Sequence, residues 1–338
     1  MRVSRPLRRR LALLAVPVAG AIVISACGSS GGSASAGSSS SGGLTNVTIA
    51  YASPVPDHLV PLVTQEAGLF KKYGLNAKVV LLTTGSEQMS SLVSGQVQLL
   101  SIPAPEPQLA AIDGQSIQEV AQLEDSFDAM MVSTAKYPTV SSLNGKSIAI
   151  SYPGDFGSFL VSVAEKRYGI SMREVPIGAY PAQVSAFESG QVDSIPALQP
   201  TQLGLVSQKV KGMHMLIDFR KVTNEPAIQL VGYGPWLKAH RSTVVKMLEA
   251  INAGFAYYKD PAHEAMVLKV IEKSTGDSPA VAQASYVNVV HNMTSTIVPS
   301  VSDMQNALGY LAEQNAKAAT FPASKLVDAS YAEAAVQK

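Results

Sequence analysis

The stretch SGQVQLLSIPAPEP, residues 94–107, has a shorter counterpart in SGQVDSIPALQP, residues 189–200. In each stretch a glycine follows a helical pattern and precedes a short apolar run that ends in prolines. Glycine commonly follows the last residue of a helix, because it reaches the left-handed conformation without a Cβ clash. The apolar run is too short for a helix and suits a buried parallel strand. Two such units predict two similar α/β lobes with ligand-binding loops where the strands end.

Composition sets the broad class of the protein. The chain has 338 residues, of which 46% are hydrophobic and 15% charged, which is ample for one large or two medium domains. The formal net charge of +1 includes five arginines within the first ten residues. Without those five, 21 basic residues face 25 acidic ones, a net charge of −4. Such a weakly acidic protein gives no electrostatic reason to expect nucleic acid as a partner.

The N-terminal segment predicts export. Its basic beginning is followed by an apolar run over residues 11–24, which has the length of a signal peptide and is shorter than a membrane-spanning helix. The tetrapeptide Ile24-Ser25-Ala26-Cys27 resembles a bacterial lipobox, in which the cysteine is lipidated. We therefore predict a lipoprotein signal peptide over residues 1–27. The alternative is an ordinary signal peptide with an incidental cysteine.

Lipid on Cys27, the only cysteine, would hold the protein to the outer face of the cell membrane through buried acyl chains. Residues 28–43 are almost entirely Gly, Ser and Ala, and such a segment cannot bury enough apolar surface to fold. We expect a flexible tether there, an extracytoplasmic location, and a folded body that starts near Leu44.

A longer stretch, EAGLFKKYGLNAKVVLLTTGSEQMSSLVSGQVQLLSIP at residues 66–103, resembles the periplasmic solute-binding proteins of the nitrate, sulfonate and taurine transport family. That family includes pyrimidine-precursor-binding proteins related to thiamine biosynthesis. The shared pattern is a helix end with Lys-Lys before Gly-Leu, a strand, a Gly-Ser loop, and Ser-Gly-x-Val before another strand. LNGKSIAISYPGDFGSFL, residues 143–160, and the second SGQV extend the resemblance over most of residues 45–310.

The resemblance implies an α/β protein with the two-lobed periplasmic-binding-protein fold of type II. Each lobe is expected to hold a mixed sheet flanked by helices, and two crossing strands join the lobes in a hinge. We assign residues 44–133 and 227–338 to lobe 1 and residues 134–226 to lobe 2. Helical patterns fill the chain after Pro235, and we expect the Ala-rich tail after Ala319 to be loosely held.

The loops expected at the mouth carry mainly neutral hydrogen-bonding and aromatic groups, which suit an organic ligand with a planar or aliphatic part. Gly154 and Gly157 let backbone amides converge at a helix N-terminus, which favours an anionic or strongly accepting ligand group; a tight connection with nothing bound is the alternative. Glu225 is a candidate partner for an amine, with a surface salt bridge as the alternative. The predicted ligand-binding residues are Tyr51, Ser53, His58, Thr84, Gly85, Ser101, Phe156, Gly157, Ser158, Tyr180, Gln199 and Asn224.

No Gly-x-Ser-x-Gly elbow, phosphate loop or dinucleotide fingerprint is present, and the five histidines show no metal-type spacing. We therefore predict no catalytic residue, no metal and no cofactor. We also expect a bulky residue in place of Ser158 to weaken binding and leave the fold intact.

The resemblance implies the solute-binding component of an ABC importer, acting as a monomer with a permease and its ATPase as partners. Its cargo would be a small organic molecule: a sulfonate, a taurine-like compound, or a pyrimidine or other aromatic compound. Two alternatives stay open. One is an enzyme of the same fold, such as a thiamine-pyrimidine synthase or a desulfinase relative. The other is a surface sensor lipoprotein without an importer.

Overall fold

The structure, a computed structural model, describes residues 43–198, 201–223 and 225–337. These residues belong to one compact unit, Gly42–Lys338. The predicted signal peptide with Cys27, residues 28–42 of the predicted tether, Gln199 and Asn224 lie outside the described residues. Within the described ranges, no helix combines the length and the apolar composition that crossing a membrane requires.

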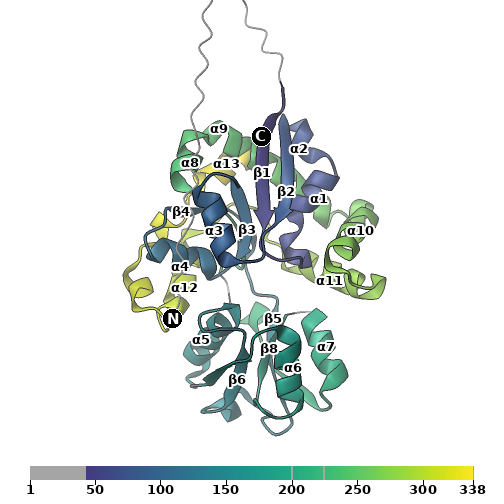
Figure 1. Cartoon of the computed structure of the whole chain (residues 1–338), viewed down its shortest axis with the longest axis vertical. Coiled ribbons are helices and arrows are strands. Elements are labelled where there is room, and N and C mark those ends of the chain that lie inside the picture. The colour runs from purple at the N-terminus through teal and green to yellow at the C-terminus, as the bar shows by residue number, and fades with distance from the viewer. Residues whose placement is uncertain (1–42, 199–200, 224, 338) are drawn as a thin grey trace, which may run out of the picture. The chain divides into compact units, whose positions relative to one another are not determined.

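Lobe 1 is built on a five-stranded sheet in the order β2-β1-β3-β10-β4 (Figure 1). β1 pairs in parallel with β2 and β3, whereas β10 runs antiparallel to both β3 and β4, so the sheet is mixed. The strands are β1 (Thr45–Tyr51), β2 (Leu75–Leu81), β3 (Leu99–Pro103), β4 (Ile117–Glu124) and β10 (Ile228–Tyr233).

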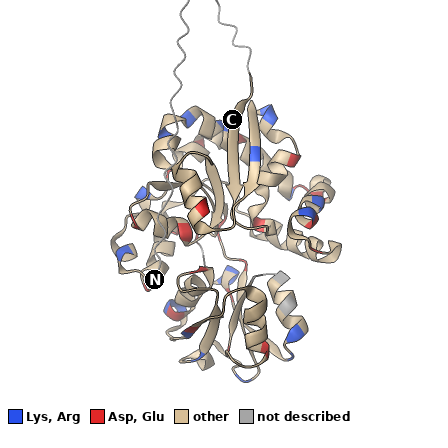
Figure 2. Cartoon of the chain, in the orientation of Figure 1, with Lys and Arg blue, Asp and Glu red and all other residues tan. Residues whose placement is uncertain are grey.

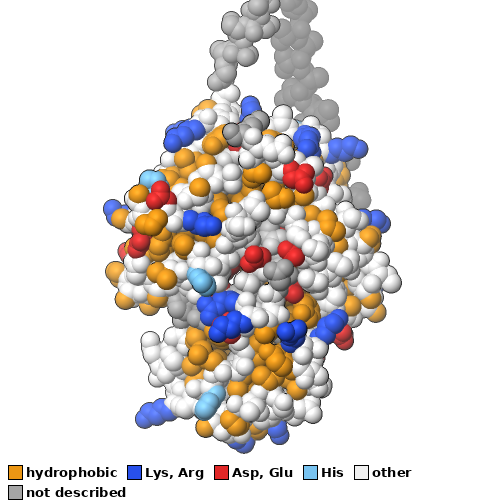
Figure 3. All heavy atoms as spheres, turned by 180° about the vertical axis from the view of Figure 1, so that it is seen from behind, with side chains coloured by type: hydrophobic (Ala, Val, Ile, Leu, Met, Phe, Trp, Pro, Cys, Tyr) orange, Lys and Arg blue, Asp and Glu red, His pale blue; other side chains and the backbone are white. Residues whose placement is uncertain are grey.

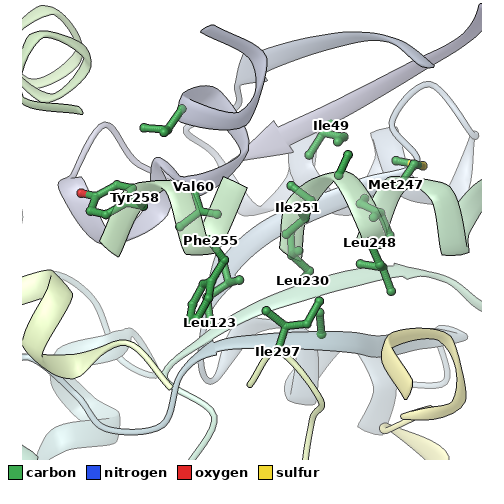
Figure 4. Packing of buried hydrophobic residues seen from close by; sticks show 14 of the residues in the cluster. Ile49, Val60, Leu123, Leu230, Met247, Leu248, Ile251, Phe255, Tyr258 and Ile297 are labelled. Carbon is green, nitrogen blue, oxygen red and sulfur yellow. The ribbon is translucent and has the colours of Figure 1, made fainter. Parts of the chain in front are cut away.

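Helices cover both faces of this sheet. On one face the long helix α9 packs against α1 and buries Met247, Ile251 and Phe255 against Ile49 and Leu230 of the sheet (Figure 4). A smaller apolar cluster around Leu100 lies on the other face. The helices outside lobe 2 are α1 (Val60–Glu66), α2 (Leu69–Lys72), α3 (Gly85–Val93), α4 (Glu106–Ile112), α8 (Gly234–Ala239), α9 (Arg241–Lys259), α10 (Glu264–Thr275), α11 (Pro279–Asn292), α12 (Val301–Leu311) and α13 (Ser330–Val336).

Lobe 2 holds an antiparallel sheet, β8-β5-β9, and a parallel pair, β6-β7. Our boundary at residue 133 gave most of β5 to lobe 1, but β5 pairs with β8 and β9, so we describe it with lobe 2. A bridge between Ile148 and Ser194 links the two sheets. The strands are β5 (Ala129–Thr134), β6 (Ser147–Ile150), β7 (Arg173–Pro176), β8 (Ile195–Leu198) and β9 (Met213–Asp218), and the helices are α5 (Phe156–Tyr168), α6 (Tyr180–Glu188) and α7 (Thr201–Lys209).

The repeated SGQV adopts the predicted geometry in both lobes. α3 ends at Val93 and α6 at Glu188, and the glycines that follow have the left-handed φ values of 76° at Gly95 and 75° at Gly190. Each copy then leads into a strand, β3 or β8. The helix stop and the strand after it are confirmed.

The residue that follows each SGQV has an equivalent structural role in the two lobes. Gln98 Oε1 accepts a hydrogen bond from the Thr48 amide of β1 at 2.5 Å. Asp193 Oδ2 accepts one from the Ser147 amide of β6 at 3.0 Å. Gln98 and Asp193 therefore tie each repeat to the neighbouring strand.

Two chain segments connect the lobes, one after β4 and one before β10. The Ala227 amide donates to the Glu124 carbonyl at 2.9 Å, and the Glu225 amide donates to the Asp125 carbonyl at 3.0 Å. The two connections therefore lie side by side and are joined by backbone hydrogen bonds. This is the arrangement of a hinge, in which a few connecting residues take up the rotation of two lobes.

The segment around α12 contacts both lobes. Met304 and Leu308 of α12 share an apolar cluster with Phe159 of α5 in lobe 2. Further along, Val327 forms a bridge with Glu119 of β4 in lobe 1. Our assignment of all residues from 227 to 338 to lobe 1 stays a prediction, and α12 is the part of it that also packs on lobe 2.

The expectation of a loosely held tail after Ala319 is wrong. The chain ends in α13, which packs along α9 and buries Tyr331 and Ala332. Arg241 of α9 lies 4.6 Å from the Tyr331 ring centroid and donates two hydrogen bonds to Ser330. The prediction treated an alanine-rich composition as a sign of weak packing. Small side chains instead let α13 approach α9 closely.

Tyr331 provides a test of how firmly this tail is held. Its side chain is only 3% exposed, so Tyr331→Ala should lower the free energy of unfolding by about 2 kcal/mol through lost burial and a residual cavity. Tyr168→Ala on α5, where the side chain is 39% exposed, is the matched control and should change little. Urea unfolding measures both, and equal stabilities of the two variants would mean that α13 is not docked.

Candidate functional site

A cavity of about 200 Å³ receives residues from both lobes, and we call it the interlobe cavity. The loop after β1 forms one wall, the ends of α10 and α11 form another, and Gln202 of α7 reaches in from lobe 2. Its lining residues are Pro54, Val55, Pro56, Asp57, Asp128, Gln202, Thr275, Asp277, Ser285 and Val289.

A second cavity, of about 180 Å³, lies in lobe 2 where β6 leads into α5. Gln202 lines this cavity too, so the two cavities share one lining residue. It brings together three predicted ligand-binding residues, Phe156, Gly157 and Tyr180. The Phe156 ring is held edge-on by Phe127 at a centroid distance of 5.3 Å. The Tyr180 hydroxyl is buried and has no hydrogen-bond partner among the described residues.

The interlobe cavity is acidic. Three carboxylates line it, from Asp57, Asp128 and Asp277, while no lysine or arginine does so among the described residues. Glu124 is buried nearby, and its pKa is raised well above the usual range by burial and by repulsion from Asp57 and Asp128. Figure 2 shows acidic positions along the edge of lobe 1 that faces lobe 2.

Asp128 occupies the connection between the lobes and is 7% exposed. Burial raises its pKa to about 7, against the opposing effects of the Asn288 hydrogen bond and the Arg220 charge. Asn288 of α11 donates to Asp128 Oδ2. Among the described residues, Oδ1 has no hydrogen-bond partner, and Arg220 Nη1 lies 4.0 Å from it.

The N-terminus of α5, where we expected a ligand anion, is capped by the protein itself. Asp155 Oδ1 accepts from the Ser158 amide and Oδ2 accepts from the Ser151 amide, both at 2.8 Å. A carboxylate at this position satisfies one orphan amide of the helix and complements the helix dipole. The glycines around Asp155 thus shape a tight, self-capped connection, and binding of a ligand anion there stays a prediction.

Ser158 is completely buried, and its polar atoms bond within the protein. Its hydroxyl donates to Glu174 Oε2 at 2.9 Å and accepts from the Gly154 amide at 3.1 Å. Gln314 Nε2 donates to the Ser158 carbonyl at 2.6 Å. These contacts describe a residue that positions the loop, and contact between Ser158 and a ligand stays a prediction.

The burial of Ser158 changes the expected effect of a bulky substitution. Ser158→Leu would overfill the site and leave the Gly154 amide and Glu174 without a partner, which should cost about 2 kcal/mol of folding free energy. Ser90→Leu on the exposed face of α3 should have little effect. Thermal unfolding followed by circular dichroism compares them. A Ser158→Leu protein that melts with the wild type would restore the original expectation of an intact fold.

The other predicted residues lie apart from these two cavities. His58 is buried and its Nδ1 lies 3.3 Å from the carbonyl oxygen of Ser101, so these two residues contact each other. Tyr51 lines a separate hollow of about 510 Å³ beside α1 and α10. Thr84 caps α3, which begins at Gly85. Ser53 is half-buried in the loop after β1.

Sequence reasoning missed the acidic residues and Ser285, because they come from three distant parts of the chain that only the fold unites: Asp57, Asp128, and the segment with Asp277 and Ser285. One signal was available: Asp57 adjoins His58 in the predicted mouth loop. In the part of the chain that the structure describes, no group of three or more His, Cys, Asp or Glu side chains is arranged to hold a metal ion.

Two lobes, a paired hinge and a cavity lined from both sides define the class of protein, an α/β protein with the periplasmic-binding-protein fold. The profile of the NMT1/THI5-like family matches residues 55–265, and the chain belongs to that family. The aliphatic sulphonate binding protein SsuA of Escherichia coli has a similar structure, with a TM-score of 0.66 and 16% identity over 82% of this chain and 94% of that one. The nitrate-binding protein NrtA of Synechocystis gives a TM-score of 0.63 and 14% identity over 87% of this chain and 89% of that one.

A relative in Brucella abortus carries a name that assigns it binding only provisionally. It is 24% identical over 169 residues, which are 49% of this chain and 52% of the relative. The match therefore spans about half the length of this relative. The structural similarities lie below 25% identity and establish the fold.

Proposed function

We propose that the protein is the extracytoplasmic solute-binding component of an ABC importer, and that it captures a small organic molecule between its two lobes. The observation that carries this proposal is the interlobe cavity, which Asp57, Asp277 and Ser285 line from lobe 1 and Gln202 lines from lobe 2. Its size, about 200 Å³, falls below the usual range for drug-sized ligands and suits a small cargo.

The mechanism is closure on the ligand. A ligand that touches both walls of the interlobe cavity binds the closed arrangement better than the open one, and this difference alone shifts the population toward closure. The paired connections around Glu124 and Ala227 are the natural axis of that movement. The importer then distinguishes the loaded, closed protein from the empty one.

The remaining parts of the proposal concern location and partners. Lipid on Cys27 and a tether over residues 28–43 would keep the body near a permease and its ATPase, with the protein acting as a monomer. A solved structural neighbour from Staphylococcus aureus is described as the ligand-binding component of an ABC-type import system, which supports the transport role.

Native mass spectrometry of the protein as its own cell makes it tests the capture function. The expected result is one small molecule bound per chain, released on denaturation with its chemical structure unchanged. Conversion of the released compound on incubation with fresh protein would favour the enzyme alternative. A protein that is isolated empty, and stays empty when incubated with a small-molecule extract of its host, would contradict capture and favour the sensor alternative.

A further inference from the structure

The interlobe cavity contains buried polar groups that the described protein atoms do not satisfy. Ser285 of α11 is 1% exposed, lines the cavity, and its hydroxyl has no hydrogen-bond partner among the described residues. Asp128 is 7% exposed, lines the same cavity, and its Oδ1 likewise lacks a hydrogen bond. Buried polar atoms are hydrogen-bonded in the great majority of cases, so two such atoms on residues that line one cavity indicate a missing partner.

The charge around these atoms is negative. Asp57 and Asp277 add carboxylates to the cavity wall, and Asp57 Oδ1 is also buried, with no hydrogen-bond partner in the described part of the chain. Glu106, at the start of α4, brings another carboxylate close to Asp155 of the lobe 2 cavity, and burial raises its pKa to about 7. Carboxylates gathered in this way repel one another unless a cation enters among them.

The guanidinium of Arg220, which lies near Asp128, is engaged elsewhere. Arg220 donates from Nε and Nη2 to the two oxygens of Asp218 at 2.8 and 2.9 Å, and from Nη1 to Asn288 Oδ1 at 2.9 Å. Its 4.0 Å separation from Asp128 Oδ1 exceeds hydrogen-bond distance. Arg220 therefore leaves the Asp128 carboxylate incompletely neutralised.

An anionic ligand would find few donors here. At the N-terminus of α5 the Asp155 carboxylate accepts from the Ser158 amide, and it also accepts from the Ser151 amide before the helix. Lysine and arginine side chains instead line a different hollow of about 650 Å³, which includes Lys166, Arg167 and Lys221. Figure 3 shows that basic side chains also gather on the back of the molecule where the lobes meet. This basic hollow and the interlobe cavity have no lining residue in common.

We infer that the interlobe cavity takes a small organic cation, such as a protonated amine, amidine or guanidine. Asp57 and Asp128 accept hydrogen bonds from its charged group, and Ser285 accepts a further one. Pro54, Val55 and Val289 provide an apolar wall for a short aliphatic or planar remainder. The inference rests on the proposed capture function and specifies the chemical class of the cargo.

Isothermal titration of the dialysed protein tests the inference. The cations are agmatine, n-butylamine and benzamidine; the comparison compounds are butanesulfonate, nitrate and neutral pyrimidine. We expect saturable binding of at least one cation and none of the anions at this site. Asp128→Asn should weaken cation binding at least tenfold and Ser285→Ala severalfold, because a buried charge-assisted hydrogen bond is stronger than a neutral one. Asp113→Asn, an exposed carboxylate at the end of α4, should leave affinity unchanged.

The possible outcomes separate the inference from the capture function. If butanesulfonate, nitrate or pyrimidine binds and the cations do not, the cation assignment is overturned and capture stands. If a cation binds equally well to wild type, Asp128→Asn and Ser285→Ala, the location is overturned. If no cation binds, the cation class is again overturned, and capture is judged independently by whether the cell-made protein carries a compound.

Discussion

Replacing Asp128 with asparagine should make the ligand-free protein more stable at pH 8. The carboxyl has a pKa of about 7 in the folded protein and about 3.9 when unfolded, so ionising it at pH 8 opposes folding. At 1.36 kcal/mol per pKa unit, the isosteric amide should raise the free energy of unfolding by up to about 4 kcal/mol. Its side-chain oxygen can still accept from Asn288.

The pH dependence of this gain has a definite sign. Between pH 4 and 7 the folded protein binds more protons at Asp128 than the unfolded chain does, so the wild type loses stability as the pH rises through that window. The gain from Asp128→Asn should therefore shrink between pH 8 and pH 5. The charged groups that affect Asp128 are Asp57, Asp218, Arg220 and Glu124.

Guanidinium unfolding of wild type and Asp128→Asn at pH 5 and pH 8 measures this effect, with Asp113→Asn as the exposed control. A residue that weakens the empty protein but is needed for ligand affinity is the expected signature of a binding site, where stability is sacrificed for function. An Asp128→Asn variant that is less stable than wild type at pH 8 would instead make Asp128 a structural ion-pair partner of Arg220.

Gly254→Ala should be among the most damaging single-methyl substitutions in lobe 1. A Cβ at Gly254 in α9 would overlap the Thr64 hydroxyl and lie 2.8 Å from the Thr64 Cβ. Thr64 is completely buried, and its hydroxyl donates to the Val60 carbonyl at 2.7 Å within α1, so it cannot move aside cheaply. We expect α9 and α1 to be forced apart, with a loss of about 4 kcal/mol or more, at the upper end of overpacking effects.

A second helical glycine provides the control. At Gly309 of α12 the nearest atom to an added Cβ is the flexible Lys166 Nζ at 3.8 Å. Gly309→Ala should therefore stabilise the protein by roughly 0.5–1 kcal/mol, because alanine loses less backbone entropy on folding. Thr64→Ala combined with Gly254→Ala should recover part of the loss. Urea unfolding of these variants would refute the packing argument if Gly254→Ala proved as stable as Gly309→Ala.

The sequence predicted the fold well where local chemistry decides the structure. The repeated SGQV correctly predicted two helix ends and the two strands that follow them. The helix ends were predictable because glycine adopts the left-handed conformation at Gly95 and Gly190 without strain. The last helix was missed, because α13 depends on packing against α9 and not on its own weak pattern. The helical patterns predicted after Pro235 begin with two helices, α8 and α9, which are separated at His240.

The candidate site was harder to predict than the fold. Phe156, Gly157 and Tyr180 were chosen from loops after strands, and they do line one cavity. Asp57 and Asp277 were missed because charged residues are most often solvated, and only tertiary structure brings them together. Ser158 was misjudged in a related way, because sequence cannot tell a loop hydroxyl that faces a ligand from one that braces the loop.

The most direct test of the central claim, capture of a small molecule between the lobes, is a crystal structure of the protein purified with the compound that it carries in its own cell. We predict that the compound occupies the interlobe cavity and contacts Ser285 or Asp128 on one side and Gln202 on the other. A compound in the hollow beside Tyr51, which residues of lobe 1 alone line, would contradict capture by closure of the two lobes.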